Sequence, residues 1–291
     1  MLNRTIAIHC IFTLFLLFNT ASANDSLFNS LEDSILFYHK KINKYQEYSE
    51  NAVYNKQIIS FLEQSLSKKE SFSYSFDSLA KIISIQKSPD DLFRIFTWNT
   101  LSNKGEYENF GFIQINNIKN DSYKLYQLTD KSDSLSNPEY KTLTVSNWLG
   151  AIYFNIIKYP EKNTNHYILL GWDGNNLFSS KKLIEVITID AFSVSFGKPI
   201  FQCNNTLKNR VVFEYSSHTD MSLRYDEKKE MIIFDHLSPS NPLFSNRPEF
   251  YGPDFSYDGL YFENDKWNLV TDIDIRNPKP ETKQVEKKNN K

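Results

Sequence analysis

The chain is poor in glycine, with eight in 291 residues, and poor in cysteine, with two. So few glycines leave little material for a phosphate-binding loop, and neither G-x-x-x-x-G-K-[ST] nor G-x-G-x-x-G occurs. The metalloprotease motif H-E-x-x-H and the hydrolase motif G-x-S-x-G do not occur either. The sequence therefore excludes these nucleotide-binding loops and offers no motif that would assign an enzyme class.

The N-terminal segment MLNRTIAIHCIFTLFLLFNTASA has the three parts of a secretory signal peptide. Arg4 supplies an early positive charge, an apolar run extends from Ile6 to Phe18, and small residues stand at Ala21 and Ala23. The apolar run is shorter than the roughly 20 residues of a membrane-spanning helix, so a retained anchor is the weaker alternative. We predict cleavage after Ala23 and a soluble mature chain, periplasmic or secreted, without a transmembrane segment.

Cleavage would remove Cys10 and leave Cys203 as the one cysteine, which excludes an internal disulfide and a four-cysteine metal site. We interpret Cys203 as a small buried side chain rather than a nucleophile. Because Arg4 is the only charged residue removed, 32 of the 33 basic residues remain against 35 acidic ones. With no basic excess, we expect no nucleic-acid partner.

Apolar spacing predicts two helices in the region 24–87. Apolar residues recur at steps of three and four from Phe28 to Tyr45, and again from Ile58 to Leu66. We expect these segments to pair as a helical hairpin whose apolar stripe packs as core. The alternative is that the stripe docks another protein during assembly.

From residue 88 to residue 277 the pattern changes to short apolar runs joined by short polar turns, which is typical of antiparallel strands. One further helix is predicted over Lys181 to Ile187, capped by Ser179 or Ser180. The fold class we predict is α+β, with an N-terminal helical hairpin followed by a large, mostly antiparallel β domain. An irregular β-propeller is the alternative, because serine-aspartate turns recur, although at uneven spacing. The lysine-rich segment 278–291 is predicted to be a disordered tail.

Candidate catalytic groups lie near the end of a predicted strand. Asp235 and His236 would supply a general base, with Asp254 or Asp258 as the second carboxyl group. The alternative is that His236 caps a loop at a strand end. The remaining histidines lie far apart in the sequence, so we predict no metal site and no cofactor.

Three aromatic residues stand beside turn residues and are candidates for ligand binding, namely Trp172, Tyr251 and Tyr257. Rings presented in this way can stack on a sugar, whereas most aromatic residues of a β-rich protein are buried. In the stretch FYGPDFSYDGLYF, residues 250–262, we predict a tight turn at Asp258-Gly259 that leads into a strand. That turn leaves Tyr251 and Asp254 as the part of the stretch most open to a ligand.

Four segments resemble those of a family of uncharacterised exported proteins of Gram-negative bacteria. They are ILLGWDGNN (168–176), FGKPIF (196–201), MSLRYDEKKEMIIFDHL (221–237) and YGPDFSYDGLYF (251–262). The resemblance extends from about Ser88 to Asn277. It implies export and one continuous β-rich module, and it brings no known activity or catalytic residue.

The function we expect is that of a non-enzymatic envelope or secreted binding protein, with an envelope glycan or protein as partner. A hydrolase that uses the Asp/His group is one alternative. An assembly protein that acts through its N-terminal helices is the other.

Overall fold

The structure is a computed structural model that describes residues 25–42, 48–102, 105–117, 122–158, 165–190 and 193–275. The signal peptide predicted at 1–23 and the tail predicted at 278–291 lie outside the described residues. Within the described part of the chain, no helix is both long and apolar enough to cross a membrane.

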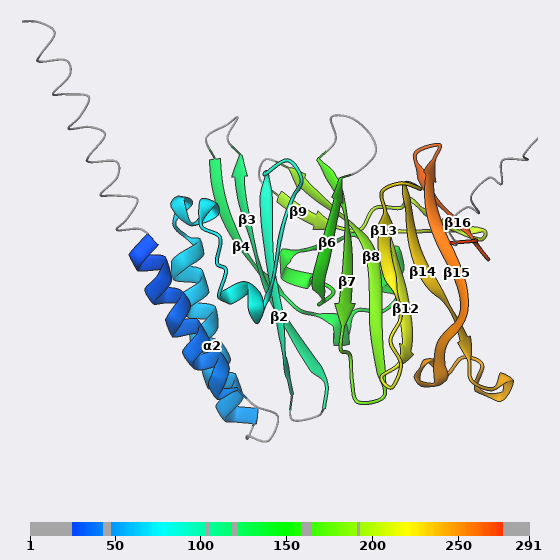
Figure 1. Ribbon diagram of the computed structural model, residues 1–291, viewed down its shortest axis with the longest axis horizontal. Helices are drawn as coiled ribbons and strands as arrows, with labels where there is room; N and C mark the ends of the chain where they lie inside the picture. Colours follow the sequence, from blue (N-terminus) through cyan, green and yellow to red (C-terminus); the bar gives the residue numbers. More distant parts are fainter. Residues whose placement is uncertain are drawn as a thin grey trace, which may run out of the picture.

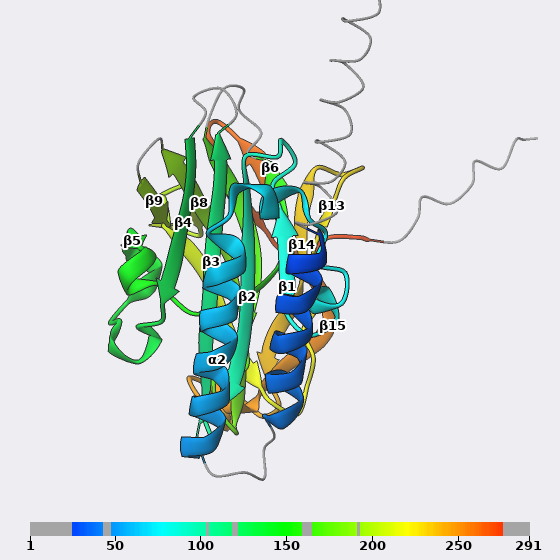
Figure 2. The same cartoon turned by 90° about the vertical axis from the view of Figure 1, so that its left-hand side faces the viewer.

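Two helices form a layer on the outer face of the first sheet (Figure 2). One covers residues 25–41, and α2 covers Tyr48–Leu66. Ile35, Ile58 and Leu62 are all buried in a cluster that includes side chains of the first sheet. Between the helices, Tyr38 stacks on Phe61 with ring centroids 5.9 Å apart. The predicted helical hairpin is confirmed, and its apolar stripe is core.

Three sheets follow the helices along the long axis of the molecule (Figure 1). The first has the order β1(Ser84–Lys87), β2(Phe93–Leu101), β3(Tyr107–Asn117), β4(Ser122–Thr129). The second has the order β5(Leu143–Thr144), β9(Ser193–Phe196), β8(Ser179–Asp190), β7(His166–Asp173), β6(Ile152–Lys158), with β12(Arg210–Ser216) also paired to β8. The third has the order β11(Thr206–Lys208), β10(Phe201–Cys203), β16(Lys266–Val270), β15(Tyr251–Glu263), β14(Met231–Pro239), β13(Leu223–Asp226).

Short 3-10 helices fill the connections: η1(Lys69–Ser73), η2(Leu79–Lys81), η4(Ser132–Ser134), η5(Pro138–Tyr140), η6(Val145–Asn147), η7(Pro242–Phe244) and η8(Pro248–Phe250). Among the strand pairs of the described residues, only β10 and β16 run parallel. The expected α+β class, a helical hairpin followed by mostly antiparallel sheet, is confirmed. The boundary expected between residues 87 and 88 falls between β1 and its partner β2.

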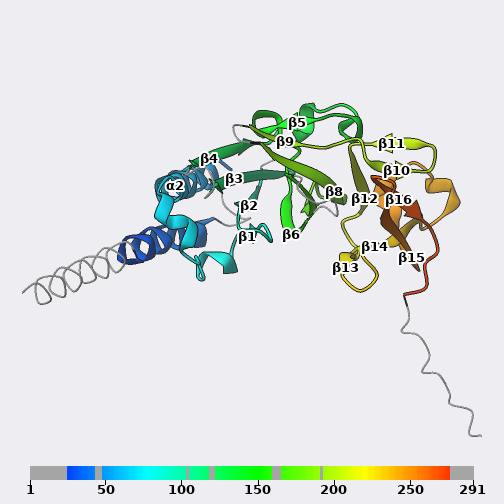
Figure 3. The same ribbon diagram turned by 90° about the horizontal axis from the view of Figure 1, so that it is seen from above.

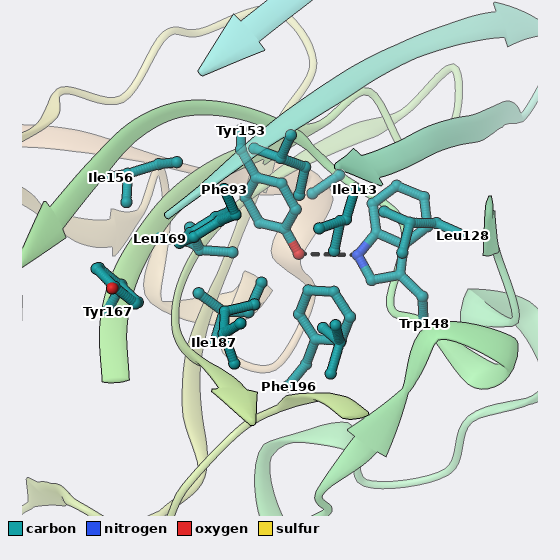
Figure 4. Close-up of a cluster of buried hydrophobic side chains, with 14 of the residues drawn as sticks. Phe93, Ile113, Leu128, Trp148, Tyr153, Ile156, Tyr167, Leu169, Ile187 and Phe196 are labelled. Atoms are coloured by element: carbon teal, nitrogen blue, oxygen red, sulfur yellow. Dashed lines mark hydrogen bonds between the residues drawn. The ribbon is translucent and has the colours of Figure 1, made fainter. Parts of the chain in front are cut away.

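The second sheet is buried on both faces. One face shares a core with the first sheet, where Trp148 donates a 2.8 Å hydrogen bond to the Tyr153 hydroxyl (Figure 4). The other face packs against the third sheet through Ile168, Ile184 and Trp267, among others. Seen from above, the third sheet lies at the end of the molecule opposite the helices (Figure 3).

Three local predictions were wrong. The helix predicted over Lys181 to Ile187 is part of β8, because the segment is rich in β-branched residues and pairs with β7, β9 and β12. The turn predicted at Asp258-Gly259 lies inside β15, where both residues pair with β14. The propeller alternative is wrong as well, since the described strands form three stacked sheets and no ring of blades.

Candidate functional site

A cavity of about 370 Å³ lies between the second sheet and the segment that connects β4 to β5. The volume lies within the range of small-molecule sites. The lining residues on which the chemistry depends are Leu149, Asp173, Lys181, Leu183, Val212 and Glu214.

Strand register brings three charged side chains to the cavity. Lys181 of β8 lies opposite Asp173 of β7 on one side and opposite Glu214 of β12 on the other. Residues that lie directly opposite each other project from the same face of a sheet, so these three form a row across adjacent strands. Two positions further along β8, Leu183 lies opposite Val212 and begins an apolar row on the same face.

Asp173 is 5% exposed, which is unusual for a carboxylate. Its Oδ1 accepts hydrogen bonds from Asn109 Nδ2 at 3.1 Å and from the Asn175 backbone N–H at 3.0 Å. Its Oδ2 accepts none from the described residues, and Asp173 is one of the residues that line the cavity. Burial raises the pKa of Asp173 above its ordinary value. One buried carboxylate oxygen is thus free to meet a ligand.

The tight turn after β7 fixes the charged end of the cavity. Asn175 has a positive φ of 52°, a conformation that asparagine tolerates better than most residues. Its backbone N–H donates a hydrogen bond to Asp173 Oδ1. Its Nδ2 donates to Ser179 Oγ at 2.8 Å and to Glu214 Oε1 at 3.3 Å. Its Oδ1 accepts from Lys181 Nζ at 2.7 Å. The Asn175 side chain therefore contacts Lys181 and Glu214, and its backbone N–H holds Asp173.

A buried ion pair holds the segment that covers the cavity. Arg210 and Glu185 have fully buried side chains, and Arg210 Nε lies 2.8 Å from Glu185 Oε2. The other end of the guanidinium donates from Nη1 to the carbonyl oxygens of Pro138 and, at 2.9 Å, Lys141. Glu185 also accepts a hydrogen bond from the Tyr153 hydroxyl. The pair therefore ties the covering segment to the sheet.

The aromatic candidates lie outside this cavity. Trp172 precedes Asp173 on β7 and so points to the opposite face of the sheet, where it is half-buried. Tyr251 and Tyr257 are half-buried on β15 of the third sheet. The Tyr251 hydroxyl accepts a 3.3 Å hydrogen bond from the Asn246 backbone N–H. The structure therefore does not bring the three rings to the lining of this cavity.

The Asp/His candidates do meet in part. Between the pairs Asp235–Tyr257 and Leu237–Pro253, β14 has one residue, His236, where β15 has three, residues 254–256. This bulge places His236 Nδ1 2.8 Å from Asp258 Oδ2. The hydrogen bond to Asp258 raises the pKa of His236 above its ordinary value.

The other two carboxylates have separate backbone contacts. Asp254 accepts hydrogen bonds from the Ser256 hydroxyl and backbone N–H, and chiefly the hydroxyl bond lowers the pKa of Asp254. The positive charge of His236 also contributes to that shift. Asp235 Oδ2 accepts the Ser222 backbone N–H at 2.7 Å and so holds the start of β13. A smaller cavity of about 230 Å³ is lined by Asp258 but not by His236.

The sequence patterns do not single out Asp173 or Lys181, and they do not place Glu214 beside them. Lys181 was assigned to a helix, and Glu214 lies 33 positions further along the chain, so only the sheet register unites them. The signal in the sequence that could have pointed to this site is the Asp173-Gly174 pair beside Trp172.

The described residues hold no group of three or more histidine, cysteine, aspartate or glutamate side chains arranged to bind a metal ion. Cys203 is a free, buried thiol, and burial raises its pKa, which disfavours the nucleophilic thiolate. No family model, no curated protein and no solved structure matches the chain.

Proposed function

We propose that the protein is an exported, non-enzymatic binding protein of the envelope or the secreted fraction, and that its ligand occupies the cavity over β7, β8 and β12. The observation that carries the proposal is the buried Asp173 carboxylate, which lines a cavity of about 370 Å³ and whose Oδ2 accepts no hydrogen bond from the described residues. A ligand with a hydrogen-bond donor could pair with this oxygen. The export part rests on the N-terminal segment and on the resemblance to exported Gram-negative proteins.

The cavity has the mixed character of a specific small-molecule site. Leu149, Leu183 and Val212 supply an apolar wall, and Asp173 and Glu214 supply polar groups at one end. Small-molecule sites are commonly apolar with a few placed polar groups that set orientation. The volume suits a small molecule or the terminal group of a larger envelope glycan or protein.

Filling the cavity tests the proposal. In Val212→Phe, the larger ring takes up space in the cavity, and we expect loss of binding for those small-molecule fragments that bind the mature protein in ligand-observed NMR. Val53→Phe is the matched control, because Val53 is 57% exposed on α2, far from the cavity lining. If the fragments bound equally well to both variants, the cavity would not be their binding site.

N-terminal sequencing of the exported chain should give Asn24 as the first residue.

A hydrolase remains the second candidate, because His236 and Asp258 form a 2.8 Å pair of the kind that orients a general base or acid. It ranks lower because His236 does not line the cavity that Asp258 lines. The assembly alternative has less support, since the apolar stripe of the helices packs on the first sheet.

The His236 pair makes its own prediction. We expect Asp258→Asn to lower the pKa of His236 in an NMR titration, because the asparagine removes the anionic partner. Since the folded-state pKa is raised above 6.5, the stability that the pair contributes is present below that pH. It is lost as the pH rises through the folded-state value. Equal titration midpoints of His236 in the unaltered protein and in Asp258→Asn would contradict the pairing. If the protein hydrolyses an ester or a glycoside, His236→Asn should abolish that turnover.

A further inference from the structure

The charges that face the cavity do not balance. Its lining contains three carboxylates, Glu139, Asp173 and Glu214, and one ammonium group, Lys181. Lys208 lies 2.9 Å from Glu139 and neutralises it. Two carboxylates therefore face one lysine, and the charged end of the cavity has a net charge of about −1.

Lys181 is not in direct contact with either neighbouring carboxylate. Its Nζ donates to Asn175 Oδ1 at 2.7 Å, and it makes no ion pair within 4.0 Å among the described residues. Glu214 uses Oε1 for its bonds to Ser179 Oγ, at 2.6 Å, and to Asn175, while Oε2 has no partner in the described chain. Asp173 Oδ2 is likewise free. Two carboxylate oxygens of the same row, on the strands that flank β8, thus have no partner in the described chain.

A second polar atom nearby is unsatisfied. Asn109 is 2% exposed, and its Nδ2 bridges Asp130 Oδ2 and Asp173 Oδ1 at 3.2 and 3.1 Å. Its Oδ1 is enclosed and has no hydrogen-bond partner. The two carboxylates therefore share the Asn109 amide, and the charge of Lys181 acts on Asp173 without a direct ion pair.

We infer that the cavity takes a small organic cation, whose ammonium, amidinium or guanidinium group binds Asp173 and Glu214 while its apolar body lies against Leu149, Leu183 and Val212. This inference rests on the proposed function, because it names the ligand class of the same cavity. A donor carrying a full positive charge forms stronger hydrogen bonds to carboxylates than a neutral donor does. The cation also offsets the cost of keeping the buried Asp173 ionised.

The test uses the mature chain and three pairs of compounds of nearly equal shape that differ in charge. The pairs are phenethylamine with phenethyl alcohol, cyclohexylamine with cyclohexanol, and benzamidine with benzamide. Binding is measured by ligand-observed NMR and calorimetry. At least one cation is expected to bind about tenfold or more tightly than its neutral counterpart, a difference of about 1.4 kcal/mol.

Variants assign that preference to the site. Glu214→Gln and Asp173→Asn should each weaken the cation about tenfold and leave its neutral counterpart unchanged. Glu214 is the safer position, because it is half-buried at the cavity mouth and its amide substitute can still accept from Ser179. Glu227→Gln, in the exposed turn between β13 and β14, is the matched control and should bind as the unaltered protein does.

Each outcome decides something different. Neutral compounds that bind as tightly as the cations, with binding lost in Val212→Phe, would overturn the cation inference and leave the cavity as a binding site. Cation binding that Glu227→Gln weakens as much as Glu214→Gln does would also overturn it, because a diffuse surface charge would then be responsible. If no compound of either charge shows binding that Val212→Phe removes, the inference is wrong, and the broader fragment set decides the proposed function separately.

Discussion

Replacing Arg210 by methionine is expected to lower the free energy of unfolding by about 3–5 kcal/mol. The change would leave Glu185 ionised and without its partner in a fully buried position. It would also release the carbonyl groups of Pro138 and Lys141 in the segment that covers the cavity. Denaturant unfolding monitored by tryptophan fluorescence measures the loss.

Arg224→Met is the matched control, since Arg224 is exposed on β13 and should change stability by no more than about 0.5 kcal/mol. The double variant Arg210→Met/Glu185→Leu should be more stable than the sum of the two single changes predicts, because no unpaired charge remains. If Arg210→Met cost no more than Arg224→Met, the ion pair would not hold the covering segment. Fragment binding in the cavity should weaken in Arg210→Met even where the protein remains folded.

Phe96→Ala is expected to cost about 3–5 kcal/mol and to loosen the helical layer. Phe96 is fully buried on the face of β2 that meets the helices, with its ring 5.8 Å from that of Phe76. The Arg94 guanidinium lies 5.1 Å from the same ring. Truncation leaves a void between sheet and helices, and neither rigid layer can close it completely.

The control for this prediction is the same substitution at a solvent-exposed ring. Phe255 is 95% exposed in the bulge of β15, so Phe255→Ala should change stability by about 0.5 kcal/mol or less. Limited proteolysis should cut within α2 faster in Phe96→Ala than in Phe255→Ala. Equal cleavage rates would mean that the helices do not depend on this contact.

The fold class could be predicted from the sequence because its signals are local. Apolar residues at helical spacing before residue 66 and short alternating runs after residue 88 each depend on near neighbours in the chain. The helix predicted at Lys181 to Ile187 failed for a non-local reason. Strand pairing with β7 on one side and β12 on the other determines the conformation of that segment, and local propensity does not report it.

The stretch FYGPDFSYDGLYF is a second case in which strand pairing, and not the local sequence pattern, determines the conformation. Its glycines and aspartates suggest turns, yet residues 251–263 form one strand, and its irregularity is the bulge opposite His236. That bulge brings His236 to Asp258, and their catalytic role stays a prediction. Tyr251 and Asp254, the residues favoured for a ligand, lie in the third sheet and outside the cavity of the second.

The sequence alone determined the two helices, the antiparallel class and the interpretation of Cys203 as a buried side chain, because each follows from composition or from neighbours a few residues apart. Only the tertiary structure decided that Asp173, and not the adjacent Trp172, faces the cavity. Alternation along a strand places neighbouring residues on opposite faces, and packing against the other sheets determines which face encloses the cavity. The row of Asp173, Lys181 and Glu214 exists because three strands pair in one register, a relation that no local pattern in the sequence contains.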